Sequence, residues 1–158
     1  MELAEDEMMP CATPIGYTAK KMSVREIMMR KAIKADERMP FGELFFDGDF
    51  DTPLTEEGAG VFAEPLEMVR LAPSAVNKQP WRVVVEENKV HFYLKRRKGS
   101  TAEAHEGKLD MQKVDLGIAL CHFALTAKEN KLQLEFVQEN PNLPSASEVE
   151  YIGSYVIA

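Results

Sequence analysis

Residues 70–84 say more about the fold than any other stretch of the chain, and they read Arg70-Leu71-Ala72-Pro73-Ser74-Ala75-Val76-Asn77-Lys78-Gln79-Pro80-Trp81-Arg82-Val83-Val84. Two prolines bracket small, hydroxyl and amide residues, and the only tryptophan of the chain follows them. Proline fixes φ, and the residue before a proline avoids the helical region. The stretch therefore predicts a helix that ends before Pro73, a rigid loop at residues 73–79, and a strand beyond Pro80.

The side chains of this loop suit the edge of a planar heterocycle. Ser74, Asn77 and Gln79 offer hydrogen-bond donors and acceptors. The small Ala72 and Ala75 would let a ring approach the backbone. The alternative interpretation is a helix-to-strand turn that satisfies its own hydrogen bonds, with the tryptophan in the core. Physical chemistry alone favours this alternative by a small margin.

Outward from the loop, the periodicity of apolar residues predicts three helices and four strands. The helices are expected at residues 23–35, 55–71 and 111–130, and the strands at residues 82–86, 89–95, 132–139 and 150–157. The two-residue link between the first two strands predicts an antiparallel hairpin. Ser23 and Glu26 form a capping box for the first helix, and Asp110 can cap the third. Pro65 should disturb the second helix.

The third helix organises the fold that these elements predict. Near its middle it is apolar on most sides, which is typical of a buried helix. The elements together predict an α+β fold, in which an antiparallel or mixed sheet packs around this long central helix. We expect one folded domain at residues 23–158, preceded by an extended arm at residues 1–22.

Composition and charge exclude several classes of protein. The 158 residues hold 19 Lys and Arg against 26 Asp and Glu, and the net charge of −7 argues against a dedicated nucleic-acid binder. No apolar run is long enough to span a bilayer, and no secretory leader is recognised. Cys11 and Cys121 are far apart and suggest neither a disulfide framework nor a metal site. We therefore expect a cytoplasmic protein without membrane or nucleic-acid partners.

Three patterns that resemble functional motifs are rejected. Residues 58–63 match G-x-G-x-x-A, but no strand leads into them and two glutamates stand where phosphates would bind. Asp47, Asp49 and Asp51 have calcium-loop spacing, but the glycine and the closing glutamate of an EF-hand are missing. The three histidines are scattered. No metal ligand set and no catalytic acid, base or nucleophile stands out.

Residues 70–84 resemble the signature of the nitroreductase family of flavin enzymes, in which a helix leads into A-P-S-A-x-N-x-Q-P-W and then a strand. The hairpin, and the long helix near residues 115–117, follow in the family's order. Residues 30–34, which read Arg-Lys-Ala-Ile-Lys, resemble a weakened form of its early R-R-S-x-R motif. Residues 15–21, which read Ile-Gly-Tyr-Thr-Ala-Lys-Lys, look like the I-G-Y-P-A-(E/K)-K segment that closes such a domain.

The order of these matches is unusual, because a closing segment precedes an opening one. An internal duplication explains it, and the chain is most similar to the branch of the family whose domain is duplicated. It would then be the tail of one repeat followed by a compact second repeat, with the resemblance covering about residues 10–157. Members of that branch are longer, which leaves open whether a further repeat precedes Met1.

The resemblance implies an FMN-dependent oxidoreductase. Such proteins bind FMN at an interface between two domain copies and reduce nitroaromatic or quinone acceptors with NAD(P)H by hydride transfer. The implied partners are a small-molecule electron acceptor and either a second nitroreductase-like repeat or a homodimer partner. Since the cofactor carries the redox chemistry, we nominate no catalytic side chain and no metal.

The resemblance also implies two groups of cofactor-binding residues. The group expected to border the flavin ring is Pro73, Ser74, Ala75, Asn77 and Gln79. The cations expected near the phosphate and the electron-rich end of the ring are Arg30, Lys31, Lys34, Lys20, Lys21 and Arg25. The alternative for these six is a solvated basic helix face. Two of them are lysines where the family has arginine, and lysine cannot reproduce the bidentate fork of arginine.

These departures keep two other functions open. One is a non-catalytic module or fragment with the nitroreductase fold, which contributes half a flavin site. The other is an unrelated α+β binding protein in which the loop motif is a coincidence.

Overall fold

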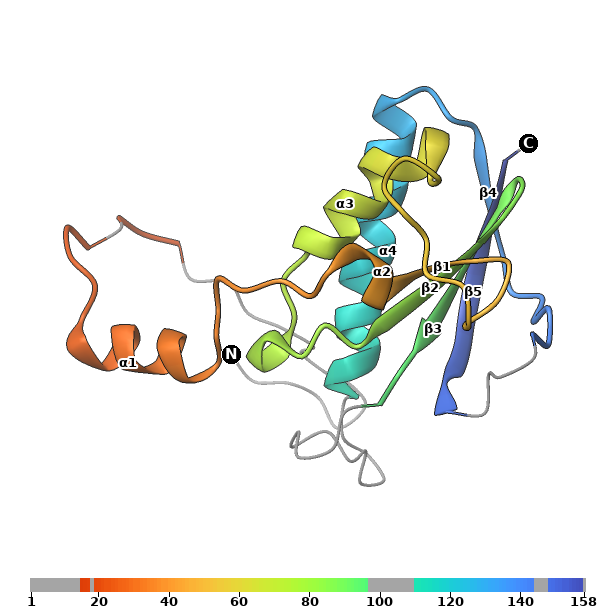
Figure 1. Cartoon of the computed structure of the whole chain (residues 1–158). Coiled ribbons are helices and arrows are strands. Elements are labelled where there is room, and N and C mark those ends of the chain that lie inside the picture. The colour runs from red at the N-terminus through yellow and green to blue at the C-terminus, as the bar shows by residue number, and fades with distance from the viewer. Residues whose placement is uncertain (1–14, 18, 97–109, 144–147, 158) are drawn as a thin grey trace, which may run out of the picture.

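The computed structural model describes residues 15–17, 19–96, 110–143 and 148–157 (Figure 1). Its helical elements are α1 (Val24–Ala32), α2 (Phe41–Leu44), the 3-10 turn η1 (Gly60–Phe62), α3 (Ala63–Leu71), the 3-10 turn η2 (Ala75–Asn77) and α4 (Met111–Glu129). Its strands are β1 (Phe45–Asp47), β2 (Trp81–Glu86), β3 (Lys89–Leu94), β4 (Leu134–Val137) and β5 (Glu150–Ile157). Most of the expected arm, together with Cys11 and His105, lies outside the described residues.

The strands form one mixed sheet in the order β1-β2-β3-β5-β4. The expected hairpin is confirmed, because β2 pairs antiparallel with β3 and Glu86 lies opposite Lys89. Only β1 runs parallel to its neighbour, with Phe45 opposite Val83. Neither β1 nor α2 is recognisable in the sequence, because three or four residues are too few to show a period.

The core lies between the sheet and a layer made by α3 and α4 (Figure 1). Alternate residues of β2 and β3 face this layer, and Trp81 is fully buried there. From α4, Phe123 packs its ring 5.4 Å from that of Phe92 and 5.4 Å from that of Tyr155. The expected α+β fold with a long helix against a mixed sheet is thus confirmed. However, only one face of α4 is buried, and Leu125 on the other face is 60% exposed.

The second helix starts later than the sequence pattern predicts. Gly60 has a φ of 53° and is the first residue of the 3-10 turn that precedes the start of α3 at Ala63. Pro65 therefore falls in the first turn of α3, where a backbone N–H has no partner inside the helix. The expected disturbance at Pro65 is absent for this reason, and the residue is buried.

Helix α1 stands apart from the sheet and from α3 and α4 (Figure 1). Its predicted cap is present, since the backbone N–H of Glu26 donates to the Ser23 hydroxyl at 3.2 Å. No residue of α1 is buried. In the part of the chain that the structure describes, no helix is long and apolar enough to cross a membrane. The division into an arm at residues 1–22 and a domain at residues 23–158 stays a prediction.

Candidate functional site

The loop at residues 73–79 holds an unusual backbone. Val76, Asn77 and Gln79 have φ values of 53°, 53° and 46°, in the left-handed region that glycine normally occupies. A β-branched residue such as valine is a marked outlier there. Strained residues of this kind persist only where the surroundings fix them, and they are common at functional sites.

Hydrogen bonds from inside the chain hold the loop in this shape. The backbone N–H of Ala75 donates to Oδ1 of Asp115 at 2.8 Å, and that of Gln79 donates to the Ser74 hydroxyl at 2.9 Å. The side-chain oxygen of Gln79, which is buried, accepts from the backbone N–H of Met39 at 2.9 Å. With Trp81 in the core, this matches the interpretation of a self-satisfied turn. Among the described residues, the hydroxyl hydrogen of Ser74 has no acceptor.

Asn77 connects the loop to the segment that follows α1. Its Nδ2 donates to the backbone carbonyls of Lys34 at 2.6 Å and Glu37 at 2.9 Å. Both hydrogens of the amide are therefore engaged. Its Oδ1 has only a long contact, 3.5 Å from Nη1 of Arg38. Asn77 can consequently accept a further hydrogen bond but cannot donate one.

Two residues that hold this site were missed by the sequence analysis. Arg38 donates to the backbone carbonyls of Ala35 at 2.9 Å and Leu71 at 3.3 Å. Asp115 holds Ala75 with one oxygen, while its other oxygen is buried without a partner in the described part of the chain. Burial raises the pKa of the Asp115 carboxyl. Leu71 is 33 residues from Arg38 and Ala75 is 40 residues from Asp115, so no local pattern could have revealed these two contacts.

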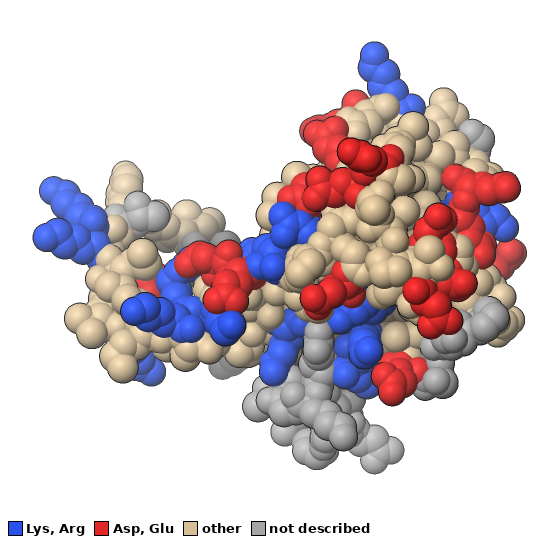
Figure 2. Space-filling view, viewed as in Figure 1, with Lys and Arg blue, Asp and Glu red and all other residues tan. Residues whose placement is uncertain are grey.

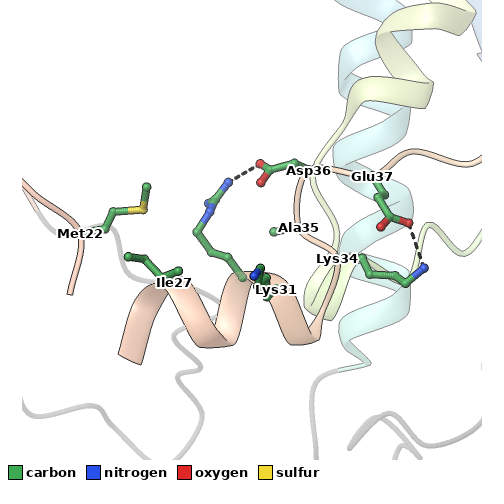
Figure 3. A pocket seen from close by; sticks show the side chains of 8 residues that line it. Met22, Ile27, Lys31, Lys34, Ala35, Asp36 and Glu37 are labelled. Carbon is green, nitrogen blue, oxygen red and sulfur yellow. Dashed lines mark hydrogen bonds and ion pairs between the residues drawn. The ribbon is translucent and has the colours of Figure 1, made fainter. Parts of the chain in front are cut away.

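The predicted cations lie on and around α1, and two of them form ion pairs. Arg30 pairs with Asp36, and Lys34 pairs with Glu37 at 3.0 Å (Figure 3). All four side chains are largely exposed, so each pair stabilises the chain by about 0–1 kcal/mol. Lys31 is exposed and has no ion pair with a described residue.

Two adjoining hollows bring part of the predicted set together. One, of about 280 Å³, lies between α1 and residues 34–37 and is lined by Arg30 and Lys31 among others. The second, of about 290 Å³, lies between residues 33–40 and the loop, where Asn77 and Gln79 line it. Lys34 and Glu37 line both. The predicted residues that line neither hollow are Pro73, Ser74, Ala75, Lys20, Lys21 and Arg25.

The size and charge of the hollows limit what they can hold. Each is slightly smaller than the roughly 300–1,000 Å³ of sites that enclose a small molecule. Cations line both hollows and amides line the second, together with apolar side chains and the acids Asp36 and Glu37. The cations and amides suit an anionic or hydrogen-bonding ligand. Each hollow can therefore take part of a cofactor-sized molecule rather than enclose all of it.

Comparison with known proteins gave two matches. The model of the family described as "Putative TM nitroreductase" matches residues 1–127. A crystal structure from Thermotoga maritima, described as "a putative nitroreductase", is 23% identical to the chain with a TM-score of 0.48. That match covers 77% of this chain and 41% of the other, so this chain spans less than half the length of the solved protein. No curated protein matches the chain.

Proposed function

Because the chain belongs to this nitroreductase family, we propose that it binds FMN beside the loop at residues 73–79 and takes part in NAD(P)H-dependent reduction of nitroaromatic or quinone-like acceptors. One observation carries the proposal: a strained loop, held from both of its ends, borders a hollow whose lining includes two cations and two amides. A shape this costly, maintained beside a ligand-sized space, is typical of a binding site.

The hydrogen-bonding capacity that the loop residues do not use within the chain suits FMN. The Ser74 hydroxyl can still donate a hydrogen bond and Asn77 can still accept one, which matches the alternating acceptors and donor on the pyrimidine edge of the flavin ring. Lys31, without an ion pair among the described residues, offers positive charge for the phosphate dianion. The residues therefore fit the cofactor in kind.

When bound, FMN would supply the hydride chemistry, and the chain's residues would supply position and charge. The side chains of Ser74 and Gln79 close the loop, so the backbone that borders the ring is preorganised. Asp115 fixes the amide of Ala75 in the same way. The cations beside the loop favour added negative charge in the site. We assign no side chain of the chain as an acid or base.

We also propose that a second nitroreductase-like unit, either another copy of the chain or another repeat, completes the site. Helix α4 is apolar nearly all round, and helices of that kind are normally buried on all sides. Yet Met111, Cys121 and Leu125 on its outer face are exposed. Each hollow is too small to enclose FMN alone, so a second unit is also needed to complete the cofactor site. We place the protein in the cytoplasm, as its cysteine use suggests.

Titration of FMN into the purified chain, followed by its fluorescence, tests the cofactor part of this proposal. We expect saturable quenching, with riboflavin as the control that lacks the phosphate. The loaded protein is then mixed with NADH or NADPH and menadione, and nicotinamide oxidation is followed. Oxidation that requires both protein and FMN supports the enzyme. Absence of FMN binding contradicts it.

A second candidate function is a module that binds flavin without turnover. It is favoured by the two small hollows and by Arg30 and Lys34, whose charges are already paired with acids. This candidate predicts flavin quenching in the titration with no oxidation of either nicotinamide. The same pair of measurements therefore separates the two candidates.

A further inference from the structure

Asp115, in the second turn of α4, is the one buried acid among the residues that the structure describes, with an exposed fraction of 2%. Its Oδ1 accepts a hydrogen bond of 2.8 Å from the backbone N–H of Ala75 in the loop. Its Oδ2 is buried and receives no hydrogen bond within the described chain. A buried carboxyl group with one unsatisfied oxygen is costly, so its presence beside the loop requires an explanation.

No cation of the described chain compensates the charge of Asp115 when it is ionised. Burial raises the pKa of Asp115, the negative charge of Asp110 on the same helix raises it further, and the bond from Ala75 opposes the shift only in part. The other charged groups of α4 and its neighbours that do not shift this pKa include Lys113, Lys78 beside η2, and Glu64, Glu67 and Arg70 of α3. Charged side chains on the described strands do not shift it either. The surroundings therefore favour the neutral carboxyl group.

The two protonation states of Asp115 place different demands on the loop. The neutral carboxyl group carries no charge and leaves at most one hydroxyl hydrogen without an acceptor. The ionised group buries a charge that the N–H of Ala75 compensates only in part, so it needs water at Oδ2. Because that oxygen is buried, water reaches it only if the loop or α4 moves.

The loop is already strained next to this bond. Val76, which follows Ala75, has a φ of 53° and a ψ of 29°, and its side chain is 57% exposed. A strained backbone of this kind persists only while its surroundings hold it. Weakening the hold on Ala75 therefore allows the loop to relax and open.

We propose that Asp115 is a proton-controlled positioning residue, which in its neutral form holds the loop at residues 73–79 closed and on ionisation releases it to water. The proposed function gives the loop a ligand but no control, so this role goes beyond it, and only the flavin measurement below rests on it. The closed loop binds the proton of Asp115 more readily than an open loop does, because burial raises the pKa of Asp115. Closure is therefore favoured at low pH and is lost as the pH rises through that raised pKa.

Three variants of the full chain test this role. Asp115→Asn cannot ionise but keeps an oxygen that can accept from Ala75, whereas Asp115→Ala removes the acceptor. Asp47→Asn, at an exposed position, is the matched control for loss of one carboxylate. Hydrogen exchange followed by NMR gives the protection factor of the Ala75 amide between about pH 5.5 and about pH 8. The amide of Phe92 in β3 is the internal reference, and the thermal midpoint is measured in parallel.

We expect the protection of Ala75 relative to Phe92 to fall several-fold in the wild-type chain as the pH rises, and to fall equally in Asp47→Asn. In Asp115→Asn the ratio should stay constant, and in Asp115→Ala it should be low throughout. The thermal midpoint of Asp115→Asn should gain on that of the wild type as the pH rises, and the effects of other titrating groups such as His91 cancel in this difference.

Three results overturn the proposal: a wild-type ratio that does not change with pH, an equal fall in Asp115→Asn, or a wild-type ratio in Asp115→Ala. If Asp115→Asn does not fold, the wild-type chain is compared with Asp115→Ala. A wild-type ratio that falls with pH towards that of Asp115→Ala supports the proposal, and an unchanged ratio overturns it.

Riboflavin, which lacks the titrating phosphate of FMN, tests whether the loop carries this control to a ligand. We expect its Kd for the wild-type chain to rise with pH and its Kd for Asp115→Asn to stay constant. Riboflavin affinity that is independent of pH in the wild type contradicts the proposal. Failure of the proposed function is a separate result: if the wild-type chain binds no flavin at any pH, that function is wrong, and hydrogen exchange at Ala75 still decides the role of Asp115.

Discussion

At the scale of single residues, the backbone of Val76 is the clearest sign that the loop is held against its preference. Its φ of 53° and ψ of 29° place a β-branched residue in the left-handed region, while its side chain is 57% exposed. Little packing therefore depends on the side chain. The conformation comes from bonds made by Ala75 and Gln79 on either side.

Val76→Gly should stabilise the protein. A left-handed conformation costs an L-residue about 1–2 kcal/mol and costs glycine almost nothing. Part of this gain is offset by the greater freedom of glycine in the unfolded chain, so we expect the free energy of unfolding to rise by about 1 kcal/mol. Urea denaturation measures it. Val61→Gly, at an equally exposed position outside the left-handed region, should destabilise. A similar loss in both variants would contradict the strain.

His91 provides a second prediction at this scale. The ring is buried on the sheet face opposite the core, with Nδ1 2.6 Å from the Ser154 hydroxyl and Nε2 3.1 Å from Glu86. Burial lowers the pKa of His91 from 6.5, and Glu86 opposes the shift only in part. The neutral ring is thus favoured in the folded state.

The sign of the pH effect follows from this shift. Because the unfolded state binds the proton more readily, the contribution of His91 to stability is complete above its unfolded pKa of about 6.5 and decreases as the pH falls towards the lowered folded pKa. The free energy of unfolding should therefore decrease between about pH 7 and pH 5.5. His91→Gln should remove this part of the slope. Identical slopes for the two proteins would show that His91 does not titrate in this range.

The polar and rigid character of the loop was predicted from the sequence, whereas the hydrogen-bond partners of its side chains were not. Ser74, Asn77 and Gln79 were recognised as polar groups in a rigid turn, and all three make hydrogen bonds. The alternative of a turn that satisfies its own hydrogen bonds matches these contacts, but the partners of Asn77 and Gln79 among residues 34–39 could not be predicted from the sequence. Arg38 and Asp115 were missed for the same reason: the contacts of Arg38 with Leu71 and of Asp115 with Ala75 join residues that only the fold brings near.

At the scale of elements, α1 and α4 both present apolar surface without a partner in the described chain. Helix α1 has nine residues, none of them buried, and helices shorter than about 12–15 residues are marginal in isolation. Met28 and Met29 on α1 are 67% and 57% exposed. Its cap at Ser23 offsets only a fraction of the cost of helix formation. Contact with a second unit would stabilise both helices.

Substitution on the two faces of α4 should separate folding from association. Leu125→Lys, on the exposed face, should prevent self-association and leave the thermal midpoint of the monomer nearly unchanged. Phe123→Ala, on the buried face, should lower the free energy of unfolding by about 3–5 kcal/mol. Light scattering measures the mass and denaturation measures the stability. A Leu125→Lys protein with the mass of the wild-type assembly would show that this face is not the interface.

Secondary structure was predicted unevenly at this scale. The hairpin and the long helix were placed within a residue at most ends, because long apolar periods and the Asp110 cap are local signals. The start of α3 was misplaced because the break comes from the backbone of Gly60. The sequence analysis expected α4 to be buried on most sides, but its outer face is exposed in this chain. An apolar pattern predicts that a face is buried, but it does not tell whether the same chain or a partner buries it.

At the scale of the whole molecule, charge is divided between α1 with its flanks and the rest of the chain. Residues 19–36 hold six of the 19 Lys and Arg but only two of the 26 Asp and Glu. Figure 2 shows basic side chains around α1 and acidic side chains gathered over the visible face of the body. An extended basic segment on an acidic protein can attract an anionic cofactor and the acidic surface of a second copy.

Sedimentation of the chain with FMN, followed at the visible absorption of flavin, tests the central claim most directly. We expect the flavin to sediment with protein, in a species containing two copies of the chain, and to remain with it after free FMN is removed. Flavin that stays unsedimented while the protein moves as a folded monomer would contradict the claim that the loop at residues 73–79 borders a flavin site between paired units.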